Sequence, residues 1–344
     1  MFDTSIDHIA SLYDRFGRQM GLDASDAREL DDWRGRVRER LREILGFSKM
    51  EAAPLDEDVL SETAFDGFTK RVVSIQTEPG VRMPMDLFLP DKPNGAAILN
   101  PHGHGGGRET TAGTDESIAR ALNGEGKLPF PAIMARRGYV VACPDARGAG
   151  MRREKNAQNG DPRANSHDEL LKLGVCFGIA PIGWMVWDLM RLADYVLTLP
   201  GVDRLGCAGM SGGGQQTLYF AAMDDRCRAA MLSGYFYGFK NALLEQPENC
   251  ACNYAPHLYE TIDMGDLGAM IAPRPLYIET GRNDPLNGTL GLANVLPQVE
   301  IARRAYALKG AEDRLLHRIH DGGHVWVAED VPEFFDRALG ESAE

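Results

Sequence analysis

The sequence lacks several features that identify particular classes of protein. No run of about eighteen apolar residues occurs in the 344-residue chain, so we expect no segment to span a membrane. The opening segment MFDTSIDHIASLYDRF alternates charged and apolar residues and has no hydrophobic stretch of the kind found in signal peptides. We therefore expect a cytoplasmic protein.

The chain also lacks an excess of basic residues. It has 37 Lys and Arg against 50 Asp and Glu, a formal net charge of -13. Because nucleic-acid binding needs a basic face, this balance excludes nucleic acid as the main partner. Internal repeats, low-complexity tracts and the G-x-x-x-x-G-K-[ST] phosphate-binding pattern are absent as well.

Cysteine is scarce, with six residues spread over the chain. Cys250 and Cys252 form the only close pair, and their C-A-C spacing lacks the second ligand pair of a zinc site. Packing within a loop is the favoured explanation for the pair. We expect neither a metal ion nor a cofactor.

The composition, with 44% hydrophobic and 25% charged residues, is that of an ordinary globular protein. Residues 1–65 are predicted to form a helical extension. Trp33, Val37, Leu41 and Leu45 recur every four positions along one helix face, which Gly46 ends. We expect this extension to cap the next domain or to mediate homo-oligomer contacts.

Residues 66–344 are predicted to form one catalytic domain of the α/β class. Residues 71–90 favour two antiparallel strands that meet near Pro79 and Gly80. Short apolar strands then alternate with helical segments, which is typical of a mostly parallel sheet flanked by helices. The expected strands are Ala96 to Asn100, Tyr139 to Pro144, Arg204 to Met210, Ala229 to Ser233, Pro275 to Thr280 and Leu315 to His320. A ligand site is expected beyond their carboxyl ends.

The strongest motif is the segment GMSGGG at residues 209–214, between an apolar strand and a helix-forming segment. It matches G-x-S-x-G, the nucleophile elbow that holds a serine at a strained turn. Ser211 is the predicted nucleophile, and the amide of Gly212 at the start of the helix is a predicted oxyanion donor. A glycine-rich turn with an incidental serine is the alternative.

A second motif, PHGHGGG at residues 101–107, follows the strand AAILN. Such a loop can direct backbone amides at an oxyanion, and we expect the amide of His104 to do so with Gly103 and Gly105 close by. A phosphate-binding loop is disfavoured because Arg108 is the only basic residue nearby. His102 and His104 are alternative candidates for metal ligands, but no third ligand stands out at a useful spacing.

Two further residues complete a predicted catalytic triad in the order Ser, acid, His. Asp284 follows the strand PLYIET, and His324 follows two glycines after the last strand. A serine hydroxyl needs a histidine to take its proton, and that histidine needs a carboxylate on its other nitrogen. Asp321 is the rival acid, although its position three residues before His324 favours a role within the loop.

Together these motifs resemble the acetyl xylan esterase and dienelactone-hydrolase-like branch of the α/β hydrolases. The resemblance extends from about Val72 to the C-terminal end, through HGHGGG, GYVVACPDARGAGMRRE, WDLMRLADYVLTLPGVD, GMSGGG, APRPLYIETGRNDP and HDGGH. It implies a cofactor-free ester hydrolase with an acyl-serine intermediate, often a deacetylase. The implied roles are nucleophile for Ser211, acid for Asp284, base for His324 and oxyanion loop for residues 102–105.

The sequence departs from this pattern in two ways. Dienelactone hydrolases proper use a cysteine nucleophile, whereas the elbow here holds Ser211. The opening segment does not resemble a signal peptide, which favours imported oligosaccharides or small esters over polymeric xylan. The expected substrate is therefore a short-chain, acetyl-type ester of a carbohydrate or another small alcohol.

Residues 151–183 are longer than a simple connection and are predicted to form a lid or insertion. Phe177, Trp184, Trp187 and Met210 are candidate pocket residues, and core packing is the alternative for the two tryptophans. The sequence leaves two other functions open. A serine peptidase related to prolyl oligopeptidases would need a propeller domain for which the chain has no room. A non-catalytic binding protein would usually lack a member of the triad.

Overall fold

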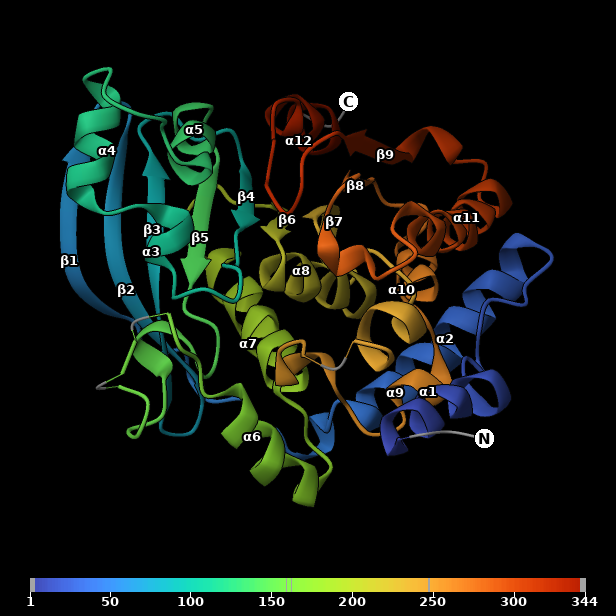
Figure 1. Cartoon of the computed structure of the whole chain (residues 1–344). Coiled ribbons are helices and arrows are strands. Elements are labelled where there is room, and N and C mark those ends of the chain that lie inside the picture. Colours follow the sequence, from blue (N-terminus) through green and yellow to red (C-terminus); the bar gives the residue numbers. More distant parts are fainter. Residues whose placement is uncertain (1–3, 159, 162, 247, 341–344) are drawn as a thin grey trace.

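A mixed sheet between two layers of helices organises the computed structural model, which describes residues 4–158, 160–161, 163–246 and 248–340 (Figure 1). The strand order is β1-β2-β3-β5-β4-β6-β7-β8-β9. The first three strands and β5 pair antiparallel, and the strands from β5 onward pair parallel. The strands are β1 (Asp58–Phe65), β2 (Phe68–Glu78), β3 (Val81–Pro90), β4 (Ala96–Leu99), β5 (Val140–Pro144), β6 (Arg204–Met210), β7 (Cys227–Ser233), β8 (Leu276–Gly281) and β9 (Leu315–His320).

The predicted hairpin and the six predicted parallel strands are confirmed, with boundaries that shift by at most two residues in the parallel strands and three in the hairpin. The prediction of helix throughout residues 1–65 is wrong, because residues 58–65 form strand β1. This edge strand is largely exposed on both faces and therefore has no apolar alternation to reveal it. Its pairing with β2 is closed by a tight turn in which Gly67 has a φ of 92°.

Alternate residues of the strands face two separate cores. In β5, Val140 and Ala142 belong to one core, while Val141 and Cys143 belong to the other. Helices α2, α7, α8, α10 and α11 cover the first core, and α3, α4, α5 and α12 cover the second. The helices are α1 (Ser5–Phe16), α2 (Ala27–Ile44), α3 (Glu109–Ala112), α4 (Asp115–Leu122), α5 (Phe130–Arg136), α6 (His167–Gly174), α7 (Pro181–Val196), α8 (Gly212–Met223), α9 (Leu258–Thr261), α10 (Met264–Ile271), α11 (Leu292–Leu308) and α12 (Val331–Leu339).

The predicted amphipathic helix before Gly46 is confirmed as α2. Its side chains Trp33, Val37 and Leu41 are buried, and Gly46 follows in the left-handed conformation that commonly ends a helix. The N-terminal helices lie beside α9 and α10, far from them in sequence (Figure 1). Arg18 forms an ion pair with Asp266 on α10 at 2.7 Å. The role of this segment as a cap or an oligomer contact stays a prediction.

No single helix in the described ranges is long and apolar enough to cross a membrane. One pair, formed by residues His167–Phe177 and Pro181–Val196 with a bend of 94°, meets the length and composition criteria together. Most of the second segment is buried in the core as helix α7.

Candidate active site

Ser211 stands in a sharp turn between β6 and α8. Its φ of 57° and ψ of -121° are strained for a residue with a side chain. The flanking glycines make this turn sterically possible. A Cβ on Gly209 would lie 2.4 Å from the carbonyl carbon of Gly213, and one on Gly213 would lie 2.2 Å from the carbonyl oxygen of Pro101. The motif therefore forms the strand, turn and helix arrangement predicted from it.

The amide of Gly212 is available at the start of α8, since the first amides of a helix have no partner within it. The loop of residues 101–107 lies against this turn. A Cβ on Gly103 would stand 3.6 Å from the Cβ of Ser211, and a Cβ on Gly212 would stand 3.0 Å from the ring of His104. The predicted oxyanion residues thus lie around Ser211.

Hydrogen bonds with buried polar groups hold the loop of residues 101–107 in place. The amide of Ala146 donates to His102 Nε2 at 3.0 Å, so His102 Nδ1 carries the proton and donates to the Gly103 carbonyl at 2.6 Å. Burial lowers the pKa of this histidine. Asp145 accepts from the amide of Arg108 at 2.7 Å and from its guanidinium at 2.8 Å. These contacts hold both ends of the loop.

The predicted acid and base lie together. His324 Nδ1 and Asp284 Oδ2 are 2.7 Å apart, and the Asp284 side chain is buried. Both groups lie over Gly234, where a Cβ would approach the His324 ring to 3.0 Å and Asp284 Oδ2 to 3.2 Å. The preceding residue, Ser233, accepts the amide of Ser211 at 2.9 Å. The structure thus gathers the three residues at the carboxyl ends of β6, β8 and β9.

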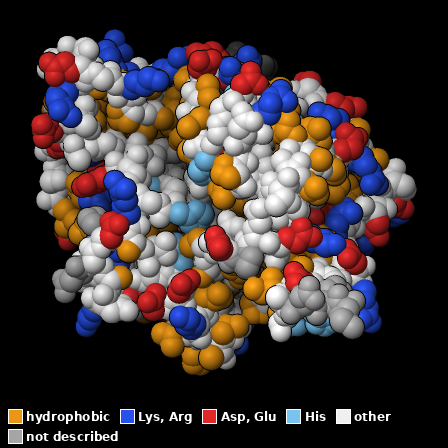
Figure 2. All heavy atoms as spheres, in the orientation of Figure 1, with side chains coloured by type: hydrophobic (Ala, Val, Ile, Leu, Met, Phe, Trp, Pro, Cys, Tyr) orange, Lys and Arg blue, Asp and Glu red, His pale blue; other side chains and the backbone are white. Residues whose placement is uncertain are grey.

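The hydroxyl of Ser211 has His104 Nδ1 as its hydrogen-bond partner, at 3.5 Å, and has no bond to His324 within the described residues. Histidine side chains gather near the middle of the face seen in Figure 2, at a hollow. The rival acid, Asp321, is 92% exposed and pairs with Arg282 at 3.0 Å. The Asp321 carboxylate therefore forms an ion pair at the surface and has no hydrogen bond with His324 in the described residues.

Glu279 is a residue that sequence reasoning missed. Its buried carboxylate accepts from the amides of Val327 and Ala328, at 3.0 and 3.1 Å, and from the Ser233 hydroxyl at 2.7 Å. It therefore ties the loop after His324 to the end of β7. No motif marks it, because a glutamate within a strand gives no sign of the distant amides that it will accept.

A cavity of about 340 Å³ opens beside Ser211. Two aromatic rings, Phe130 and Trp326, lie 5.0 Å apart at its wall. Met210, a predicted pocket residue, lines it as well. The full lining is Gly103, Gly105, Thr110, Thr111, Phe130, Met210, Ser211 and Trp326.

The structure does not bring the other predicted pocket residues to this cavity. Phe177 is 71% exposed. Trp187 packs edge-on against Phe47 and donates to the Thr77 carbonyl at 3.1 Å, and Trp184 lies beneath the Arg147 guanidinium. Both tryptophans pack against the larger core because α7 turns that face toward the sheet. Core packing, the alternative weighed for them, is what the structure shows.

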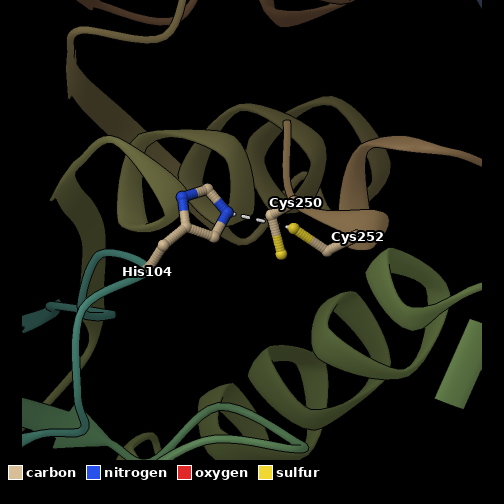
Figure 3. Close-up of side chains that lie close together, drawn as sticks. All are labelled: His104, Cys250 and Cys252. Carbon is tan, nitrogen blue, oxygen red and sulfur yellow. Dashed lines mark hydrogen bonds between the residues drawn. The ribbon is translucent and has the colours of Figure 1, made fainter. Parts of the chain in front are cut away.

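His104, for which the sequence offers no third metal ligand at a useful spacing, has two cysteines beside it in the structure. The ligand atoms of His104, Cys250 and Cys252 all lie within 4.8 Å of one another (Figure 3). Hydrogen bonds from Cys252, His104 and His167 lower the pKa of the Cys250 thiol against the opposing effect of burial. Burial raises the pKa of the Cys252 thiol. The sequence gives no sign of this cluster, because His104 and the two cysteines are about 150 positions apart in the chain.

Comparisons with known proteins agree with this architecture. No family model matches the chain. A Bacillus subtilis protein named "Putative hydrolase YtaP" is 26% identical over 243 residues, which cover 67% of this chain and 74% of that protein.

Solved structures are similar over most of the chain. The crystal structure of a "putative acetyl xylan esterase" from Bacteroides fragilis has a TM-score of 0.74 and 17% identity, covering 93% of this chain and 83% of that chain. A glucuronoyl esterase from Solibacter usitatus has a TM-score of 0.66 and 18% identity, covering 94% and 98%. The chain therefore has the α/β-hydrolase fold, and the predicted resemblance to acetyl xylan esterases is confirmed at the level of structure.

Proposed function

We propose that the protein is a serine carboxylic ester hydrolase that acts through an acyl-serine intermediate on Ser211. The observations that carry this proposal are the buried Asp284 at 2.7 Å from His324 and the strained elbow turn that holds Ser211. A carboxylate, an imidazole and a partly exposed hydroxyl at the carboxyl ends of strands in one sheet are the three groups that acyl transfer requires.

The mechanism follows from the roles of these groups. His324 Nε2 takes the proton of Ser211, whose Oγ attacks the carbonyl carbon of the ester. The amides of Gly212 and His104, with Gly103 and Gly105 beside them, stabilise the oxyanion. His324 then gives the proton to the departing alcohol. Water attacks the acyl-enzyme by the same route, while Asp284 holds the imidazole and stabilises its charge.

The cavity supports a small substrate. Its volume of about 340 Å³ is at the lower end of the range for small-molecule sites. Aromatic rings and threonine hydroxyls share its wall, a combination that suits a sugar ring with apolar faces and polar edges. We therefore propose acetyl-type esters of carbohydrates or other small alcohols as substrates, in keeping with the names of the esterases whose structures this chain resembles.

Hydrolysis of a series of p-nitrophenyl esters from acetate to decanoate tests this function. We expect the wild-type protein to favour the shortest chains, because the cavity leaves little room for a longer acyl group. Ser211→Ala is expected to lower turnover by roughly 10⁴-fold or more while the fold is retained.

Three results would contradict the proposal. Turnover of peptide substrates but not of esters would favour a serine peptidase, and the absence of all turnover in a folded wild-type protein would favour a binding protein. Retention of most turnover in Ser211→Ala would remove Ser211 from the mechanism.

A further inference from the structure

Four side chains from three distant segments converge beside Ser211. His104 comes from the loop after β4, His167 from the first residue of α6, and the two cysteines flank Ala251 in the turn Ala251–Asn253. His104 Nε2 lies 3.0 Å from Cys252 Sγ, and His167 Nδ1 lies 2.9 Å from Cys250 Sγ. Figure 3 shows the His104 ring pointing at both cysteines, in front of α8.

The surroundings of His167 orient it as a ligand. Its Nε2 lies 3.1 Å from the carbonyl oxygen of Arg147, which can only accept, so Nε2 carries the proton. The lone pair on Nδ1 therefore points at Cys250 Sγ. A backbone carbonyl that accepts from the far nitrogen is the common second contact of a metal-binding histidine.

We propose that Cys250 Sγ, Cys252 Sγ, His104 Nε2 and His167 Nδ1 bind one Zn²⁺ ion. Two thiolates and two imidazoles form a donor set that favours zinc, and four protein ligands are typical of a structural site. The ligand atoms of His104, Cys250 and Cys252 all lie within 4.8 Å of one another, which leaves room for bonds of about 2.3 Å to sulfur and about 2.1 Å to nitrogen. His167 Nδ1 is placed by its 2.9 Å contact with Cys250 Sγ, and its ring must shift for Nδ1 to reach the same ion. Each thiol that binds as thiolate releases its proton to solvent, so ion and ligands together are neutral.

The polar atoms of these side chains also form hydrogen bonds within the protein. Cys252 Sγ lies 3.1 Å from Gln215 Oε1, which accepts from the thiol. The ion replaces these weak thiol bonds with four bonds that link the oxyanion loop, α6 and the turn at Cys250. Segments up to about 150 residues apart would then be fixed around Ser211.

The ion also has a consequence for catalysis, which rests on the proposed function. Zn²⁺ on Nε2 of His104 leaves the proton on Nδ1, and Nδ1 lies 3.5 Å from Ser211 Oγ. Binding of Zn²⁺ is therefore expected to position the loop of residues 101–107. We expect it to raise kcat for ester hydrolysis about tenfold or more over protein without the ion.

Metal analysis of protein produced with zinc in the medium tests the site. We expect about one zinc per chain in the wild type, and little in Cys252→Ser or His167→Gln. Cys176→Ser is the matched control, because Cys176 is exposed and outside the cluster, and it should retain the ion. Ser211→Ala should also retain it while losing ester hydrolysis, which separates this proposal from the proposed function.

A second measurement does not depend on variants that fold. Wild-type protein stripped by a chelator is titrated with Co²⁺, and we expect the thiolate-to-cobalt absorption band and the visible bands of tetrahedral Co²⁺. Wild-type protein without zinc, together with no such bands on titration of folded protein, would overturn the proposal. Full zinc content in both Cys252→Ser and His167→Gln would overturn the ligand assignment.

Discussion

At the scale of single residues, chemistry with a strict local pattern could be predicted from the sequence. The elbow requires Gly209 and Gly213 at fixed positions around Ser211, and the structure shows the contacts that impose this requirement. Asp284 and His324 could be predicted because each follows a strand and the order of the triad is fixed by the fold. Asp284 and His324 do lie together, as the 2.7 Å contact and the shared position over Gly234 show, and the amide of Ser211 bonds to the carbonyl of the neighbouring Ser233.

Residues that act through distant contacts could not be predicted. Glu279 accepts amides from residues nearly fifty positions away, and the cluster around His104 draws on residues about 150 positions away. The cavity wall is similar, since Phe130 and Trp326 meet only after the chain has folded. No fixed sequence spacing relates the residues in such contacts, whereas the residues of the elbow always have the spacing G-x-S-x-G.

The assignment of Asp284 rather than Asp321 as the acid gives a prediction at this scale. Asp284→Asn should lower kcat by roughly 10³- to 10⁴-fold, because an amide no longer holds the imidazole in the working tautomer or stabilises its charge. Asp321→Asn is the matched control and should change kcat little, since Asp321 pairs with Arg282 at the surface. Steady-state kinetics on a short-chain ester checks both. A large loss in Asp321→Asn with activity retained in Asp284→Asn would reverse the assignment.

At the scale of elements, buried charges join α7 to the loop after β5. Asp188 on α7 accepts from Arg147 at 2.7 Å and from Arg152 at 2.6 Å, and its side chain is 3% exposed. Burial raises the pKa of this carboxyl, but the two guanidinium groups outweigh burial and lower it to about 2. The same loop leads into the segment that presents His167, so this contact also supports the neighbourhood of the site.

The charges of Asp188, Arg147 and Arg152 predict a pH dependence of stability. A folded-state pKa of about 2 against an ordinary value of 3.8 means that the folded protein binds the proton less readily than the unfolded chain. The stabilisation, about 2 kcal/mol, is therefore present above about pH 4 and is lost as the pH falls toward 2. Denaturant unfolding at a series of pH values measures it.

Asp188→Asn should lower the free energy of unfolding at pH 7 by about 3 kcal/mol, because it leaves two buried guanidinium groups without their shared partner. The deficit should shrink between pH 4 and pH 2. Asp203→Asn is the control, since this carboxylate is 77% exposed and should matter by less than about 0.5 kcal/mol. A deficit in Asp188→Asn that is independent of pH would contradict this account.

The strands illustrate what sequence patterns can and cannot predict about elements. The parallel strands β4 to β8 are largely buried on both faces, so each appears as a short apolar run between turns and could be located to within one or two residues. β1 could not be located, because an exposed edge strand has no apolar face. The aromatic residues of α7 were ambiguous for a related reason, since core and pocket residues are both apolar.

At the scale of the whole molecule, the sheet decides where chemistry can occur. Parallel strands end at one edge, and the nucleophile, the acid and the base follow β6, β8 and β9 there. The antiparallel strands β1, β2 and β3 and the N-terminal helices lie outside this arrangement and leave it intact. The fold class could therefore be predicted from the alternation of strands and helices, whereas the residues that line the cavity could not.

The central claim is that Ser211 is an activated nucleophile. The most direct measurement is labelling of the folded protein with a fluorophosphonate, followed by mass spectrometry of its peptides. We predict one adduct, on the peptide that contains Ser211, with no adduct on that peptide in Ser211→Ala. Folded wild-type protein that takes up no label, or takes it up at another serine, would contradict the account.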